Sequence, residues 1–336
     1  MCLSNYTDSL TIGAMKSPII LTFLGVVISL AGVATAKEKK PAGPAAPVGW
    51  LNLQSGSRKL SVSEEDLQKV TRNLPRGALL PVFKTKERRG VKLAQVGAIN
   101  LETGSAELGW LEMNPGEVKP PESYPTDDSL LQLLGAPYLD DFTAQHTDIA
   151  RFLVRRTGGP AALLCYVVTV SLEMAKLVVF TPGEGTYSLG AALNVSISDI
   201  HAGISSIEIR DLVGDGNDCV ITKEPFRGGA QTSGTGLLIR EILNGQFQIL
   251  WQAPLEFRNL SQFNPKIQVL QPPERNIGAP GTVTTGDVSF RPMGKGQEPV
   301  WKGKVEFFAF GREKAAQSVN IEKVCPWEGS HFAPLH

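Results

Sequence analysis

Residues 205–224, SSIEIRDLVGDGNDCVITKE, hold the pattern from which the fold of this chain is predicted. An alternating run, SSIEIRDL, precedes a short acidic segment with two glycines, and a second run, CVITKE, follows it. Alternation of apolar and polar residues with a period of two indicates β-strands, and Asp-Gly segments between such runs indicate tight turns. We therefore expect two antiparallel strands joined by an acidic turn.

The acidic segment DLVGDGNDCV, residues 211–220, allows two interpretations. Calcium takes about six to eight oxygen ligands, and Asp211, Asp215 and Asn217 stand where a calcium loop would supply them. Two other positions that need an oxygen-bearing side chain hold Val and Cys, so the ligand set is incomplete. We expect a turn in which Gly216 takes a left-handed backbone and the aspartates accept hydrogen bonds from turn amides. A degenerate calcium site is the alternative.

The chain beyond residue 130 continues in a rhythm of short strand-like runs. Gly, Pro and Asn separate them, and Asn244-Gly245 predicts a type I′ hairpin because both central residues need positive φ. A short helix is expected only in DSLLQLLGAPYLDDF, residues 128–142, behind an Asp/Ser cap. The rhythm predicts an antiparallel all-β domain over residues 130–336, either a few-bladed or partial β-propeller or a β-sandwich. The runs are IARFLVRR, AALLCYVVTV, KLVVF, SSIEIRDL, CVITKE, GLLIREI, QFQILW, KIQVL, VEFFAFG and NIEKV.

A smaller module is expected before this domain, over residues 59–114. Three strand-like runs, GALLPVF, GVKLAQVGAIN and ELGWLEM, are separated there by the polar segments KTKERR and LETGSA, which we interpret as loops. Several short strands within so few residues suggest a small closed barrel. The segment PGEVKPPESYPTDDS, residues 115–129, has four prolines and no periodicity, so we expect it to be the linker between the two domains.

The smaller module resembles a bacterial SH3-like domain over residues 59–118. The resemblance is carried by the Leu-x-x-Gly entry at Leu74 and Gly77, and by the closing strand that contains Gly109-Trp110-Leu111. It implies a β-barrel that binds peptides or wall polymers, or that serves as a spacer.

The acidic turn is similar to that of FG-GAP/VCBS repeats. Asp211, Gly214, Asp215 and Gly216 match the Asp-x-x-Gly-Asp-Gly turn that links two blade strands in that family. The resemblance implies a propeller-type arrangement of hairpins, with calcium bound in some members.

Two features of the smaller module are candidates for ligand binding. Trp110 is an aromatic side chain that could stack on a ligand, although a strand tryptophan beside leucines is expected in the core. A basic cluster is the second candidate and either contacts an anionic polymer or is merely solvated. Its members are Lys84, Lys86, Arg88, Arg89 and Lys92.

The N-terminus has the features of a secretory signal peptide over residues 1–36, with the true start at Met15. Lys16 precedes an apolar run from Ile19 to Leu30, and the small residues Ala-Thr-Ala end the segment. We expect the exported protein to begin near Lys37 and to continue in a Pro/Ala-rich tether over residues 37–58. N-terminal sequencing of the exported protein checks this expectation. An uncleaved anchor through residues 18–36 is the alternative.

Composition limits the functions that the chain can have. The 336 residues carry 33 basic and 33 acidic side chains, so no overall field favours nucleic acid, which we do not expect as a partner. Cleavage would remove Cys2 and leave Cys165, Cys219 and Cys325. Three cysteines form at most one intramolecular disulfide, and three buried thiols are the other interpretation.

No motif for catalysis stands out in the sequence. We find no nucleophile elbow, no His-Glu-x-x-His and no Cys-x-x-Cys, and the four histidines are scattered. The sequence therefore predicts a non-catalytic binding or adhesion protein of the cell envelope, periplasmic or secreted, without a membrane span after cleavage and without a cofactor unless calcium binds. Its expected partner is a peptide, a polysaccharide or another protein. An exported hydrolase with an active site assembled in the C-terminal β-domain is the alternative.

Overall fold

The computed structural model describes residues 46–53, 58–135, 147–169, 174–195, 203–227, 232–259, 281–308 and 314–335. The expected signal peptide lies outside these residues, as does most of the expected tether. Residues Ala45–His336 form one compact unit, to which the following description applies. The described part of this unit consists of antiparallel sheets and a single α-helix, so the prediction of an all-β chain is confirmed.

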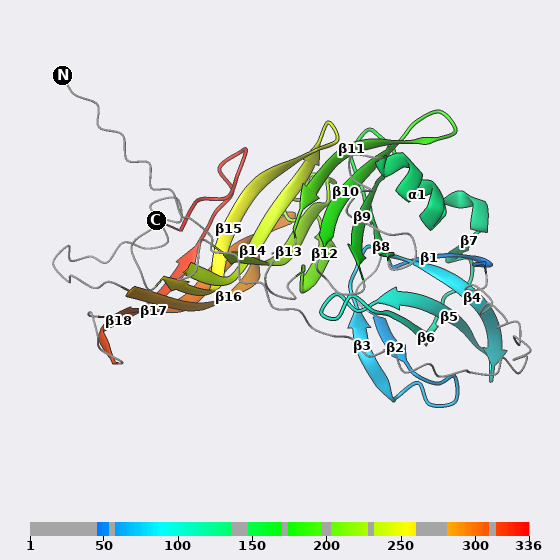
Figure 1. Cartoon of the computed structure of the whole chain (residues 1–336), viewed down its shortest axis with the longest axis horizontal. Coiled ribbons are helices and arrows are strands. Elements are labelled where there is room, and N and C mark those ends of the chain that lie inside the picture. Colours follow the sequence, from blue (N-terminus) through cyan, green and yellow to red (C-terminus); the bar gives the residue numbers. More distant parts are fainter. Residues whose placement is uncertain are drawn as a thin grey trace, which may run out of the picture. The chain divides into compact units, whose positions relative to one another are not determined.

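An eleven-stranded sheet, here called the first sheet, contains strands from both expected domains (Figure 1). Its neighbours along the main path come partly from distant parts of the sequence, because β8 pairs with β4. In chain order its strands are β1 (Gly49–Asn52), β2 (Arg58–Ser61), β3 (Val70–Leu74), β4 (Ala78–Arg88), β5 (Val91–Ile99), β6 (Ala106–Glu112), β7 (Val118–Lys119), β8 (Thr147–Val154), β9 (Ala162–Thr169), β10 (Ala175–Pro182) and β11 (Tyr187–Asn194). In space the order is β11-β10-β9-β8-β4-β5-β6-β2-β3, and β1 pairs with β4 and β7.

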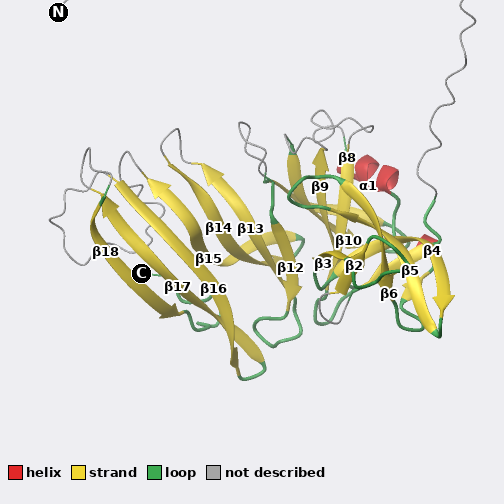
Figure 2. Ribbon diagram, turned by 90° about the horizontal axis from the view of Figure 1, so that it is seen from below, coloured by secondary structure: helices red, strands yellow, loops and turns green. Residues whose placement is uncertain are grey.

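A seven-stranded sheet, here called the second sheet, is a simple meander in which every strand pairs with its neighbours in sequence (Figure 2). The expected hairpin at Asn244-Gly245 is confirmed, since these residues have φ of 52° and 74°. The strands are β12 (Ser206–Arg210), β13 (Cys219–Arg227), β14 (Thr232–Leu243), β15 (Gln246–Asn259), β16 (Gly281–Met293), β17 (Gly296–Phe308) and β18 (Ala315–Val324).

The helix α1 (Asp127–Leu134) forms where a short helix was expected. Its cap is Thr126, whose hydroxyl accepts a hydrogen bond from the Ser129 amide, and acidic residues in the first turn suit the positive end of the helix dipole. A 3-10 turn, η1 (Pro121–Ser123), precedes it. The Pro-rich segment 115–129 thus contains β7, η1 and the start of α1.

The two expected domains share the first sheet. Ala78 and Leu79 of β4 pair with Phe152 and Arg151 of β8, and the Leu153 amide donates to the Gly77 carbonyl at 3.0 Å. β4 also pairs with β1 and β5. The strands of residues 59–114 therefore continue through β4 into β8 and do not close into a ring. The described strands therefore form no closed barrel over residues 59–114, contrary to the expectation of one.

The segment KTKERR, expected as a loop, is mostly strand. Residues 84–88 extend β4 and pair with β5 as far as Arg88 with Val91. The connection shrinks to Arg89-Gly90, whose φ values are 50° and 80°. Two successive residues with positive φ match the twist of a two-residue hairpin, so the polar residues can continue the ladder up to the turn.

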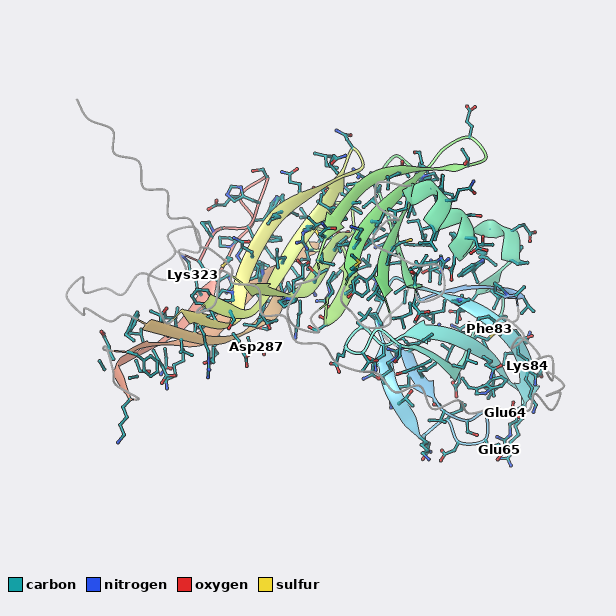
Figure 3. All side chains as sticks on the ribbon, viewed as in Figure 1. Glu64, Glu65, Phe83, Lys84, Asp287 and Lys323 are labelled. Atoms are coloured by element: carbon teal, nitrogen blue, oxygen red, sulfur yellow. The ribbon has the colours of Figure 1, made fainter. Side chains whose placement is uncertain are left out.

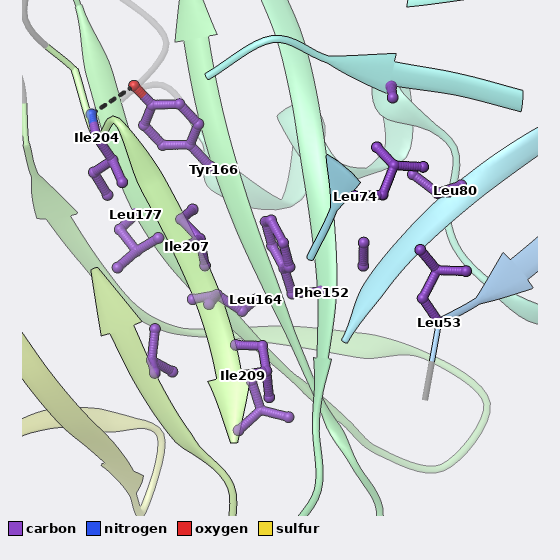
Figure 4. Packing of buried hydrophobic residues seen from close by; sticks show 14 of the residues in the cluster. Leu53, Leu74, Leu80, Phe152, Leu164, Tyr166, Leu177, Ile204, Ile207 and Ile209 are labelled. Atoms are coloured by element: carbon purple, nitrogen blue, oxygen red, sulfur yellow. Dashed lines mark hydrogen bonds between the residues drawn. The ribbon is translucent and has the colours of Figure 1, made fainter. Parts of the chain in front are cut away.

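Strands β9 and β10 are buried on both faces, which explains their uninterrupted apolar sequences. One face packs on β12 through Ile207 and Ile209, and Figure 4 shows these residues against Leu164. The other face packs on α1 through its three leucines. A hydrogen bond from the Ile204 amide to the buried Tyr166 hydroxyl, 3.1 Å long, satisfies the polar end of that side chain.

Trp301 organises a separate apolar cluster in the second sheet. Its fully buried indole lies over two glycines, Gly286 on β16 and Gly303 on β17, and donates a hydrogen bond of 2.8 Å to the Pro254 carbonyl on β15. A Cβ atom at Gly303 would lie 2.5 Å from the Trp301 ring and from the Thr285 carbonyl oxygen. The absence of side chains at these glycines is therefore what lets the ring lie flat on the sheet.

We predict that Gly303→Ala lowers the free energy of unfolding by about 1 to 3 kcal/mol, because the added methyl group must displace the Trp301 ring. Gly159→Ala is the matched control, since nothing lies within 4 Å of a Cβ atom at that position. Thermal unfolding followed by circular dichroism measures both. Equal melting temperatures for the two variants would contradict the packing role of Gly303.

Candidate functional site

The acidic turn between β12 and β13 satisfies its own carboxylates. The two Asp211 carboxylate oxygens accept hydrogen bonds from the Gly214 and Gly216 amides at 2.6 and 3.0 Å. Those of Asp215 accept from the Asn217 amide and side chain at 2.9 and 3.0 Å. Gly216 has a φ of 91°, so its expected left-handed backbone and the expected hydrogen bonds of the turn are confirmed.

Asp218 fastens this turn to the first sheet. Its carboxylate is 4% exposed, and it accepts three hydrogen bonds from Arg155, which directly follows β8. The donors are the Arg155 amide at 2.9 Å and the guanidinium Nε and Nη2 at 2.9 and 2.7 Å. The Asp218 amide donates in return to the Arg155 carbonyl at 3.0 Å. Hydrogen bonding to Asp218 raises the pKa of Arg155 above its ordinary value.

Neighbouring residues extend the contact between the turn and the first sheet. The Asn217 side-chain oxygen accepts a hydrogen bond of 2.8 Å from the Thr157 amide, and the Thr157 hydroxyl donates to the Asp215 carbonyl at 2.9 Å. Backbone and side-chain groups on both sides are thus paired. This arrangement holds the β8–β9 connection against the β12–β13 turn.

The opposite side of the turn contacts the β16–β17 hairpin. The Gln297 amide donates to the Leu212 carbonyl at 2.6 Å, and the Gln297 side-chain oxygen accepts from Arg210 at 2.8 Å. A Cβ atom at Gly214 would lie 2.6 Å from the Lys295 carbonyl carbon, so only glycine allows this approach. One short turn therefore contacts two segments, the β8–β9 connection and the β16–β17 hairpin, that lie far from it in the sequence.

The candidate calcium ligands Asp211, Asp215 and Asn217 lie together in this turn, and the side-chain oxygens of all three already accept hydrogen bonds, whereas the ligand expected from Asn217 is its backbone carbonyl. A bound ion would have to replace hydrogen bonds within the turn and the one from Thr157. In the described part of the chain, no three His, Cys, Asp or Glu side chains are grouped so as to hold a metal ion. The calcium site stays a prediction.

The basic cluster lies on the β4–β5 hairpin (Figure 3), and part of it is neutralised. The Lys86 ammonium lies 2.5 Å from a Glu64 carboxylate oxygen, and the Arg88 guanidinium donates to the Glu64 carbonyl at 2.7 Å. The hydrogen bond from Lys86 holds the pKa of Glu64 below its ordinary value. Glu64 follows β2, and no pattern in the sequence indicated that it would contact this hairpin.

Three members of the cluster remain available to a partner. The side chains of Lys84, Arg89 and Lys92 are exposed and form no hydrogen bond or ion pair with another described residue. Arg89 lies in the two-residue turn, so its charge stands at the tip of the hairpin. These three side chains are the free part of the candidate binding surface.

Trp110, the other candidate for ligand contact, is 7% exposed on β6. Leu108, two residues earlier on the same strand, is 64% exposed instead. The interpretation of Trp110 as a core residue is therefore confirmed, and its ring is not presented to solvent.

A buried arginine that sequence reasoning missed lies between β8 and the segment before α1. Arg151 is 4% exposed, pairs with Asp127 and places its guanidinium 4.8 Å from the centre of the Trp50 ring. The Trp50 indole donates to the Pro121 carbonyl at 2.9 Å. Burial, together with the charge of Asp127, raises the pKa of the nearby Asp148. These contacts hold the Pro-rich segment against the sheet.

A second buried ion pair lies within the second sheet. Arg240, 3% exposed, donates to both carboxylate oxygens of Glu224 and to the Thr222 hydroxyl. The nearby Tyr166 has its pKa raised to about 12, chiefly by burial. The charges of Arg240 and Glu224 compensate each other, which explains how the strands tolerate a buried arginine. The ion pair therefore offers no unpaired charge to a ligand.

Cysteine and histidine chemistry is limited in the described residues. Cys165, Cys219 and Cys325 are free and buried, as the interpretation of three buried thiols predicts, and burial raises the pKa of Cys165 and of Cys219 to about 12. His331 contacts Glu328 through Nε2 at 3.2 Å and the Ser330 hydroxyl through Nδ1 at 3.0 Å. His146, His201 and His336 lie outside the described residues.

No family model and no curated protein matches the chain. Helices long and apolar enough to cross a membrane are absent from the described ranges.

We predict that Asp218→Asn lowers the free energy of unfolding by about 1 to 3 kcal/mol, because it leaves Arg155 without its buried charged partner. Asp215→Asn is the control: its side chain is exposed and contacts only Asn217, so a change within about 0.5 kcal/mol is expected. Urea unfolding at neutral pH measures both variants. Similar losses in the two would show that Asp218 has no special role in joining the sheets.

We predict that 1 mM calcium leaves the melting temperature unchanged, because the oxygens of the turn are already engaged. An extracellular-type site with a Kd of about 10⁻⁴ M would add about 1.4 kcal/mol at that concentration. Differential scanning calorimetry with magnesium at equal ionic strength as the control measures the effect. A calcium-specific rise that disappears in Asp215→Asn would establish the metal site.

Proposed function

We propose that this chain is a non-catalytic exported binding protein of the cell envelope, and that the free basic side chains of the β4–β5 hairpin contact an anionic partner. The observation that carries the proposal is the local imbalance of charge at this hairpin. The chain as a whole is neutral, yet Lys84, Arg89 and Lys92 project from two paired strands without a partner in the described residues.

The hairpin is suited to contact because its backbone is already fixed. Cross-strand pairing extends to Arg88 and Val91, so the tip loses little conformational entropy when a partner binds. Val91 is 40% exposed beside the charges and adds apolar area. An acidic polysaccharide supplies carboxylates that these cations, on both faces and at the tip of the hairpin, would meet, and an acidic peptide is the other member of this class.

We also propose which known architectures the two parts of the chain resemble. We infer that residues 59–114 derive from an SH3-like module and that residues 130–336 form a sandwich-like domain. The apolar cluster between β8–β10 and β12–β13 supports the sandwich, since two sheets face each other across it. A propeller, the other fold considered, would need separate four-stranded blades, whereas β12–β18 form one meander.

The hydrolase remains the alternative function, and one observation favours it. His331 lies between a carboxylate and a hydroxyl, which are the contacts that a triad histidine makes. Both His331 and Glu328 are about half exposed and come from one turn, so the group lacks a site that excludes water. Labelling by a fluorophosphonate probe that is lost in Ser330→Ala would favour the hydrolase over binding alone.

We predict that replacing Lys84, Arg89 and Lys92 together by Glu weakens binding to immobilised polygalacturonate at least ten-fold, because attraction at the hairpin becomes repulsion. The control replaces Lys69, Lys119 and Lys295 by Glu, which gives the same net charge at exposed positions elsewhere. Biolayer interferometry at about 150 mM salt, with neutral dextran as the second surface, measures the affinities. Equal loss in both triple variants, or equal binding to neutral dextran, would contradict the proposed surface.

A further inference from the structure

Strand β18 forms an open edge of the second sheet. It pairs with β17 on one side, and no described residue pairs with its other side. Its ten residues include neither Pro nor, from Ala315 to Ile321, any charge. Natural sheets commonly protect edges with charges, prolines or covering segments, so a long neutral edge strand is ready to pair with another strand.

The other edges are protected in ways that β18 is not. β12 is five residues long and carries the charged pair of Glu208 and Arg210. β11 is covered by the β14–β15 turn, since a Cβ atom at Gly190 would lie 2.8 Å from the Gly245 carbonyl oxygen. β3, which ends the first sheet on the other side, is also only five residues long and carries Arg72. The length of β18 and its lack of charge from Ala315 to Ile321 distinguish it from these edges.

The direction of the free backbone groups of β18 follows from its pairing with β17. The Cys325 amide donates to the Pro299 carbonyl, so residue 325 faces β17. Backbone groups alternate in direction along an antiparallel strand, so the even-numbered residues from 318 to 324, which lie beyond the bulge at Ala316, direct their N–H and C=O groups away from the sheet. A partner strand must pair with these residues.

We propose that the partner is a second copy of this chain, with the two β18 strands antiparallel about a two-fold axis at Asn320. In this register Val319 faces Ile321 of the second copy, and no like charges stand opposite each other. The even-numbered residues form the hydrogen-bonded pairs, as their direction requires. Two seven-stranded sheets would join into one continuous sheet.

A second observation supports the same register. The Gln317 side-chain oxygen is buried and has no hydrogen-bond partner. With the axis at Asn320, Gln317 stands opposite Lys323 of the second copy, in a non-hydrogen-bonded pair where side chains approach most closely. A polar side chain then stands opposite Gln317, and neither residue meets a like charge. Sliding one strand by a single residue, which moves the axis to a point between two residues, would pair even-numbered with odd-numbered residues and direct their backbone groups away from each other.

The oligomeric state of the chain, as it is recovered from cells, tests the proposal. Sedimentation velocity at tens of micromolar should show a dimer, and Asn320→Pro should raise its dissociation constant at least ten-fold because it removes the outward amide at the axis. Proline is tolerated at edge positions whose N–H faces solvent, so the monomer should keep its melting temperature. A monomeric native chain, or a dimer that Asn320→Pro leaves unchanged, would overturn the proposal; a peptide partner would then be the occupant to seek.

Disulfide cross-linking tests the register independently of that variant. Asn320→Cys should form a covalent dimer on mild oxidation, because hydrogen-bonded pairs place their Cα atoms about 5.5 Å apart. Ser318→Cys is the matched control, since its own counterpart lies four residues along the partner strand, about 13 Å away. Equal cross-linking of the two variants, or none of either, would contradict an axis at Asn320.

Discussion

The buried hydrogen bonds between Asp218 and Arg155 are the constraint on which the rest of the structure depends. They join the end of β8 in the first sheet to the β12–β13 turn, whose opposite side contacts the β16–β17 hairpin. A buried carboxylate is costly unless it is paired, so folding is favourable only when the β8–β9 connection reaches the turn. The apolar cluster between the sheets supplies the burial energy, while this pair fixes how the sheets meet.

Much of the fold could be predicted from local patterns. The continuous apolar runs of β9 and β10 and the alternating run of β12 are strands, and Asn244-Gly245 forms the expected hairpin. The strand β16 was missed, because GTVTTGDVSFRPM is rich in Gly, Thr and Pro and resembles a loop. Pairing with β17 along its whole length makes it a strand, and no local pattern reports such a partner.

The candidate sites show the same division between local and tertiary information. Hydrogen bonds within the acidic turn follow from spacing alone, because Asp211 and the amides that it accepts from lie a few residues apart. The contacts of Arg155 and Gln297 with this region could not be predicted, since they bridge 63 and 87 residues of sequence. Likewise, the basic cluster was visible in the sequence, whereas Glu64, which pairs with Lys86 and whose backbone carbonyl accepts from Arg88, was not.

The pairing of β4 with β8 also has a kinetic consequence. The second sheet joins only strands that are adjacent in sequence, so its contact order is low and its hairpins can form early. β4 must instead wait for β8, which is separated from it by three strands and a helix, and the loop that this pairing closes costs entropy before burial offsets it. The first sheet is therefore expected to complete last, and an unpaired β4 with its apolar residues is the segment most exposed to misassociation while the chain folds.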